Sequence, residues 1–331
     1  MLRVALILVF AGIPLSPAAA FTPTVDQKLC AALPANADVI AACTRIIEAP
    51  ESSTLDRAVS FNFRADAARS GSDVSAAIAD YSRALTLMPT LVPALKGRGI
   101  AYRNAQNYDL SLQDFDKGIA LKPDDSDLYN SRGITYRQLG NSAQAIADFD
   151  EAIKLDPKSA AAFNSRGNVY GDLHQPDRAI ADFTAAIKLD RNYADAYFNR
   201  GTIEADDKSQ FDKAIEDFSV AIKLDPSNTD ALVSRAAAYI GQHKAQPALA
   251  DLNTAIARTP DLERAYLHRG TLYLNLGDAA KGVADLTKAT QLAPKDAQAL
   301  YFRGIARQRG GDTPGGDADI AAAKTLDPDI H

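Results

Sequence analysis

Small and large apolar residues recur along most of the chain with helical spacing. A small residue is followed four positions later by an aromatic residue or leucine, and three positions after that by another small residue, as in Ala145, Phe149 and Ala152. Positions i, i+4 and i+7 lie on one face of an α-helix. A second apolar pattern precedes this one, with an aromatic residue or leucine four positions before a glycine or alanine. The two patterns predict a pair of packed helices, and the pair recurs along the chain.

The repeat has a period of 34 residues. The second helix of each pair is closed by a proline at the same register: Pro89, Pro123, Pro157, Pro226, Pro260, Pro294 and Pro328. Arg191 stands in the fourth of these eight places, and a single 35-residue step corresponds to one extra residue within 201–213. We therefore predict eight units, followed by a short tail at 329–331: 55–89, 90–123, 124–157, 158–191, 192–226, 227–260, 261–294 and 295–328.

Each predicted unit also carries one arginine in its first helix and one aspartate in its second. The arginines are Arg64, Arg98, Arg132, Arg166, Arg200, Arg235, Arg269 and Arg303. The aspartates are Asp80, Asp114, Asp148, Asp182, Asp217, Asp251, Asp285 and Asp319. This constant register predicts a ladder of structural ion pairs, either between the two helices of a unit or between neighbouring units. The alternative is that the arginines line a groove and bind anions, but eight copies are typical of a scaffold because active sites are unique.

The first twenty residues differ from the rest. A single arginine precedes an apolar run too short to span a bilayer, and PLSPAAA ends in the small residues that signal peptidase recognises. We predict a signal peptide at 1–20, cleavage after Ala20 and a periplasmic or secreted protein with no membrane span. Residues 21–54 are predicted to cap the first repeat, with a disulfide between Cys30 and Cys43. A redox-active or metal-binding thiol pair would need a CxxC spacing or nearby histidines.

Charge and chemistry narrow the function further. The chain has 36 lysines and arginines against 42 acids, a net charge of −6, which argues against general binding to nucleic acid. Its four histidines are scattered through different units, without metal-ligand spacing. The glycines of 309–317 lack the preceding strand and the GKS or GKT of a phosphate loop. We predict no cofactor, no metal and no enzyme activity.

The 34-residue pattern of small, aromatic and proline positions resembles the tetratricopeptide repeat and covers residues 55–328. Glu204, Arg307 and Arg191 depart from it. The resemblance implies an all-α fold, a right-handed superhelical α-solenoid of helix-turn-helix units. With its signal peptide and two cysteines, the chain looks like the exported tetratricopeptide proteins of Gram-negative bacteria.

The resemblance further implies that the first helix of each unit lines a concave groove. The candidate groove residues are Asn62, Lys96, Arg103, Asn130, Arg137, Asn164, Phe198, Asn199, Tyr301 and Phe302. Asparagine both donates to and accepts from a peptide backbone, so these residues suit an extended protein or peptide partner. Ordinary solvation of polar helix faces is the alternative. We predict a binding scaffold or adaptor in the bacterial cell envelope, and the alternative role is a periplasmic scaffold for exopolysaccharide export or envelope biogenesis. The partner, the biological process and the oligomeric state stay open.

Overall fold

A computed structural model describes residues 24–32, 37–206 and 209–330. The predicted signal peptide lies outside these residues. Eighteen helices and no strand occur in the part of the chain that is described. The first nine are α2 (Val25–Cys30), α3 (Ala37–Glu48), α4 (Thr54–Ser70), α5 (Val74–Leu87), α6 (Val92–Asn104), α7 (Tyr108–Leu121), α8 (Ser126–Gln138), α9 (Ser142–Leu155) and α10 (Ala160–Asp172). The others are α11 (Pro176–Leu189), α12 (Ala194–Asp206), α13 (Phe211–Leu224), α14 (Thr229–Gly241), α15 (Ala245–Arg258), α16 (Glu263–Asn275), α17 (Ala279–Leu292), α18 (Ala297–Arg309) and α19 (Thr313–Leu326).

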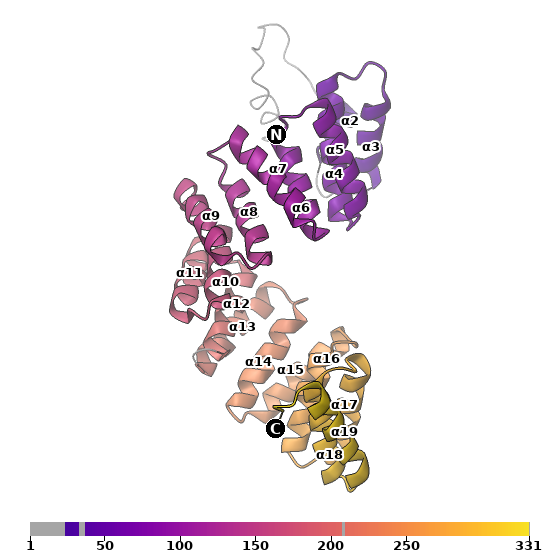
Figure 1. Cartoon of the computed structure of the whole chain (residues 1–331), viewed down its shortest axis with the longest axis vertical. Coiled ribbons are helices and arrows are strands. Elements are labelled where there is room, and N and C mark those ends of the chain that lie inside the picture. Colours follow the sequence, from indigo (N-terminus) through magenta and orange to yellow (C-terminus); the bar gives the residue numbers. More distant parts are fainter. Residues whose placement is uncertain (1–23, 33–36, 207–208, 331) are drawn as a thin grey trace. The chain divides into compact units, whose positions relative to one another are not determined.

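The chain forms two compact units, which divide within α10 at residues 165 and 166. In unit 1 each helix from α2 to α9 packs on the next, as it does in unit 2 from α11 to α19. Figure 1 shows the two helices of a hairpin side by side, for example α4 beside α5 and α18 beside α19. First helices of successive hairpins also touch, including α4 with α6 and α6 with α8. This arrangement confirms the predicted all-α solenoid of helix-turn-helix repeats.

The core of each hairpin lies where the first helix crosses the large side chain of the second. Phe149 is fully buried on α9, and a Cβ atom added to Gly133 on α8 would lie 2.7 Å from its ring. Phe183 and Leu286 take the same place beside Gly167 and Gly270, each again 2.7 Å from an added Cβ. The glycine inside the first helix is therefore explained by the close approach of the two helices, which offsets its low helix propensity.

The turn inside each hairpin has one residue in the left-handed backbone region. The eight residues are Ser72, Gln106, Gly140, His174, Ser209, His243, Gly277 and Gly311. Left-handed backbone is costly for residues with a β-carbon, and five of the eight carry one. The extra residue of the fifth unit lies in this turn, since four residues separate α12 from α13 where three separate α6 from α7.

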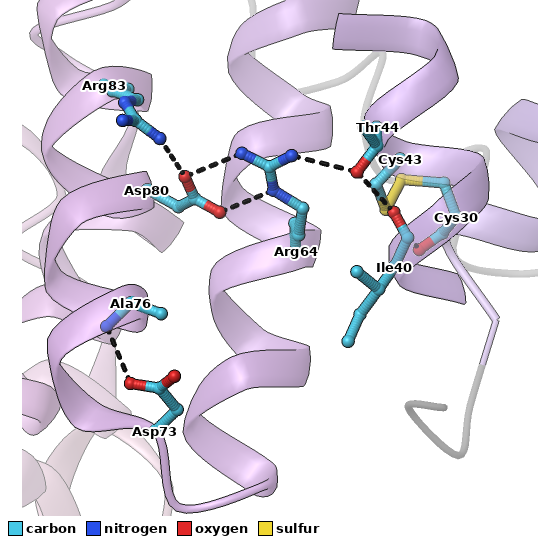
Figure 2. A network of polar contacts seen from close by, with 9 residues as sticks. All are labelled: Cys30, Ile40, Cys43, Thr44, Arg64, Asp73, Ala76, Asp80 and Arg83. Carbon is cyan, nitrogen blue, oxygen red and sulfur yellow. Dashed lines mark hydrogen bonds and ion pairs between the residues drawn. A yellow bond between two sulfur atoms is a disulfide. The ribbon is translucent and has the colours of Figure 1, made fainter. Parts of the chain in front are cut away.

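Helices α2 and α3 cover the outer side of the first repeat. Cys30 and Cys43 form a disulfide of 2.09 Å, which confirms the predicted pairing. Both cysteines are buried in an apolar cluster with Val39, Ala42, Ile46 and Ala67, the last on α4. The hydroxyl of Thr44 on α3 accepts a hydrogen bond of 2.9 Å from Arg64 on α4 (Figure 2). Helix α3 therefore contacts the first repeat in the manner of a second helix from a preceding hairpin.

Candidate functional site

The arginine and aspartate of each hairpin form a two-pronged ion pair. In all eight, Nε and Nη2 of the arginine donate to the two oxygens of the aspartate of the same hairpin at 2.6–2.9 Å. This geometry is among the strongest available to a guanidinium. It raises the pKa of Arg98 above its ordinary value, with the Asp114 hydrogen bond as the main cause and burial opposing it.

The third nitrogen of these arginines reaches the neighbouring hairpin. Nη1 donates at 2.6–3.1 Å to a residue on the second helix of the preceding hairpin, or on α3 in the first repeat. The acceptors for seven of the arginines are Thr44, Ser82, Asp116, Thr184, Ser219, Asn253 and Thr290. The two arrangements considered for the ladder, within a unit and between units, therefore occur together.

The ladder is a structural device that leaves little of the arginines for a ligand. Their side chains are 16–22% exposed and those of the aspartates 7–11%. Removing one partner of a buried pair costs about 3–5 kcal/mol because the other charge is left unpaired. The anion-binding alternative for these arginines is not supported by this geometry.

Two of the four asparagines expected in the groove lie deeper than an open binding face requires. Asn62 is 6% exposed and Asn164 7% exposed, so little of either side chain is open to a partner in this structure. Asn62 donates to Asp66 at 3.3 Å, one turn along α4. The amide oxygens of Asn62 and Asn130 are buried without a hydrogen-bond partner in the described structure. The first helices approach closely enough to bury these short side chains, which leaves longer ones to reach a partner.

The other groove candidates are half-buried. Lys96 pairs with Asp127 on α8, with 2.9 Å between Nζ and Oδ2. Phe198 contacts the ring of Phe218 at a centroid distance of 5.8 Å, so it belongs to the core of its hairpin. Tyr301 and Phe302 form an edge-on pair with centroids 5.7 Å apart. Three further candidates are also half-buried: Arg103, Arg137 and Asn199.

Asp66, Arg69 and Tyr81 form a polar network that the repeat pattern did not predict. Tyr81 donates a 2.6 Å hydrogen bond to Asp66 and accepts one of 3.4 Å from Arg69. Its ring fits beside Gly97, where a β-carbon would overlap it. Arg69 lies five residues after Arg64, as Arg103 and Arg137 do after their own ladder arginines. That column of the repeat was the available signal.

Two departures from the repeat pattern also lie inside the hairpins. Glu204, in a tyrosine position, is 6% exposed with its Oε2 unpartnered in the described structure. Burial raises the pKa of its carboxyl, and Asp217 raises it further. Arg307, the other replacement, donates a 2.8 Å hydrogen bond to Asp319 and so reinforces the last ladder pair.

Within 24–32, 37–206 and 209–330, no group of three or more histidines, cysteines, aspartates and glutamates is placed to hold a metal ion. No helix in these ranges combines the length and apolar character needed to cross a membrane. The first-helix faces are the remaining candidate site, and their chemistry is that of hydrogen bonding and charge pairing.

Comparisons with known proteins agree with this architecture. Family models described as tetratricopeptide or TPR repeats match residues 115–147, 133–173, 164–229 and 263–296. The chain therefore contains tetratricopeptide repeats. No curated protein matches the sequence.

Solved structures share the fold at low sequence identity. A tetratricopeptide repeat protein from Parabacteroides merdae is 17% identical, with a TM-score of 0.54 over 78% of this chain and 98% of its own. A chain of the APC/C hetero-tetramer Cut9-Hcn1 is 16% identical, with a TM-score of 0.65 over 81% of this chain and 52% of its own. PilW, described as a type IV pilus biogenesis factor, is 19% identical, with a TM-score of 0.58 over 62% of this chain and 95% of its own. At these identities the likeness concerns the fold alone.

Proposed function

We propose that the protein is a scaffold or adaptor that binds an extended segment of a partner protein along the first-helix faces of its repeats. The observation that carries this proposal is that different positions of the repeat hold the hairpins together and present polar side chains on the first helices. The arginines and aspartates of the ladder are paired with one another and hold the hairpins together. Long polar side chains at other positions of the first helices are half-buried, so part of each remains accessible to a partner. Such a face offers hydrogen bonds to a peptide backbone and side-chain contacts at regular intervals.

We further propose that the protein works in the cell envelope of a Gram-negative bacterium, after export. The signal-like pattern of residues 1–20 supports export. The buried disulfide between Cys30 and Cys43 supports an oxidising compartment, because such bonds are rare in the cytosol. The proposed boundaries of the mature protein are a cap at 21–54 and repeats at 55–328.

Two experiments test these proposals separately. For export, the full chain is expressed in a Gram-negative host, and mass spectrometry without reductant is expected to find Phe21 as the first residue and Cys30 joined to Cys43. Free thiols, or retention of Met1 in the cytoplasm, would contradict export. For binding, a photo-crosslinking residue placed at Lys96 or Arg103 is expected to capture a protein, with exposed Lys154 on α9 as the control position. Equal capture from all three positions would contradict a first-helix site.

A further inference from the structure

Arg103 is a half-buried cation without a carboxylate partner among the described residues. Its one hydrogen bond runs from Nη1 to the backbone oxygen of Ser131, at 3.2 Å. A guanidinium has five N–H donors and no acceptor, so most of its donors are unused. Burial lowers the pKa of Arg103 below its ordinary value, and the charge of Arg69 lowers it further. This is the opposite of the ladder arginines Arg98 and Arg235, whose pKa is raised by the hydrogen bonds of Asp114 and Asp251.

Arg69, on the preceding first helix, shares its only carboxylate with other donors. Its Nη2 lies 3.5 Å from Oδ1 of Asp66, and its Nε donates to the hydroxyl of Tyr81 at 3.4 Å. The same aspartate accepts from Asn62 and, more closely, from Tyr81 at 2.6 Å. Arg69 therefore has only one carboxylate, which is already engaged, while the nearby Arg103 has none among the described residues, and this leaves a local excess of positive charge.

The two arginines belong to one surface of unit 1. Asn62, Asp66 and Arg69 share a face of α4 at spacings of four and three residues, and Lys96 and Arg103 share the corresponding face of α6. Helices α4 and α6 are in contact. Packed helices have axes about 8–10 Å apart, and an extended chain advances about 3.3 Å per residue. In an extended peptide of the polyproline II type, with three residues per turn and a rise of about 3.1 Å, acidic side chains three positions apart lie on one side and about 9 Å apart, which matches the spacing of the two helices.

We propose that Arg69 and Arg103 bind the carboxylates of an acidic, extended segment of the partner protein, in which aspartates or glutamates recur at every third residue. This proposal rests on the proposed function and names the class of segment. The matching position of the repeat in unit 2 supports the assignment to unit 1. Ile240 and Leu274 stand there, and they have no charge to offer an acid.

The test uses the full chain and two fluorescent peptides of about twelve residues, one with glutamate at every third position and one with glutamine there. Binding is measured by anisotropy at low and at physiological salt. The wild type is expected to bind the glutamate peptide at least about tenfold more tightly, because charge-assisted hydrogen bonds to carboxylates exceed neutral ones. R103Q and R69Q are each expected to lose about tenfold or more of this affinity. The control R264Q removes an equally charged arginine that is 55% exposed on α16, and it is expected to bind like the wild type.

A folding defect is distinguished by thermal unfolding and by a second variant. R103Q relieves an uncompensated buried charge, so its Tm is expected to equal or exceed that of the wild type. R103K keeps the charge and loses the fork geometry, so it is expected to bind with intermediate affinity.

The outcomes separate this inference from the proposed function. Peptide binding that is unaffected by R69Q and R103Q would overturn the inference and leave the scaffold function standing. Failure of both peptides to bind would overturn the inference, and absence of crosslinked protein from Lys96 and Arg103 as well would overturn the scaffold function. Tighter binding of a single-stranded RNA or an acidic oligosaccharide than of the glutamate peptide would identify a different class of ligand and overturn the inference.

Discussion

The two units of the molecule share one ladder and differ on their first-helix faces. In unit 1 the position two residues before the ladder arginine is polar, and the position five residues after it is arginine: Asn62, Lys96, Asn130, Asn164, Arg69, Arg103 and Arg137. In unit 2 the same two positions are mostly apolar or small: Phe198, Val233, Leu267, Tyr301, Gly171, Ala205, Ile240, Leu274 and Gln308. The columns that hold the repeats together are constant, whereas these two columns of the first helices differ between the units. The constant columns therefore account for the packing of the repeats, and the two variable columns are where we propose that a partner binds.

The largest expected effect tests whether the ladder does the same work in both units. Asp148→Ala in unit 1 and Asp251→Ala in unit 2 are each expected to lower the free energy of unfolding by about 3–5 kcal/mol, because a half-buried arginine loses both of its bonds to the buried carboxylate. The measurement is urea unfolding followed by circular dichroism. Asp116→Ala is the matched control, since Asp116 also pairs with Arg132 but is 56% exposed, and it is expected to cost about 0–1 kcal/mol. Equal losses for Asp148→Ala and Asp116→Ala would contradict a buried ladder.

The disulfide belongs to unit 1 only, so its removal sharpens the comparison. Replacing Cys30 and Cys43 by serine opens a bond between residues 13 positions apart, which by chain entropy is worth roughly 2–3 kcal/mol. Hydrogen exchange is expected to rise in α2, α3 and α4 and to stay unchanged in α14 to α19. A uniform rise in hydrogen exchange over the whole chain would show that the disulfide does not stabilise the cap and the first repeat alone.

The carboxyl pair of Glu263 and Asp296 makes the stability of unit 2 depend on pH. Burial raises the pKa of Glu263 from 4.5 to about 7, with the charge and hydrogen bond of Asp296 adding to it and Arg264 opposing. The folded state therefore holds a proton that the unfolded state has lost. The resulting stability is full below about pH 4.5 and is lost as the pH rises through about 7.

Glu263→Gln tests this pair because it fixes the neutral form. The variant is expected to lose less Tm than the wild type between pH 4.5 and pH 7.5, and Glu216→Gln, which removes an exposed acid on α13, serves as the control. Parallel Tm curves for Glu263→Gln and the wild type would refute the assignment.

The smallest expected effect concerns the left-handed turn residues, which the two units share. Gln106→Gly in unit 1 and His243→Gly in unit 2 remove a β-carbon at φ values of 61° and 58°. Each is expected to stabilise the protein by about 0.5–1 kcal/mol, and Gly277→Ala is expected to destabilise it by a similar amount. Thermal unfolding checks all three, and a loss of stability in both glycine variants would contradict the turn geometry.

The repeated helical hairpins could be predicted from the sequence because the same residue types recur at the same positions of every unit. The period, the packing residues around Phe149 and the partners of the ladder arginines all follow from columns repeated eight times. The disulfide followed from two cysteines in a segment that was predicted to be exported. The depth of the asparagines could not be predicted, because burial depends on how closely successive first helices approach. The Tyr81, Asp66 and Arg69 network was also missed, since it depends on one hydroxyl and one glycine that the repeat pattern does not contain.

The central claim is that recognition belongs to the first-helix face of unit 1. Hydrogen exchange of the full chain, measured with and without the glutamate peptide at physiological salt, tests it most directly. We predict slower exchange in α4, α6 and α8 and unchanged exchange in α14, α16 and α18. Protection confined to unit 2, or an equal effect on both units, would contradict the account.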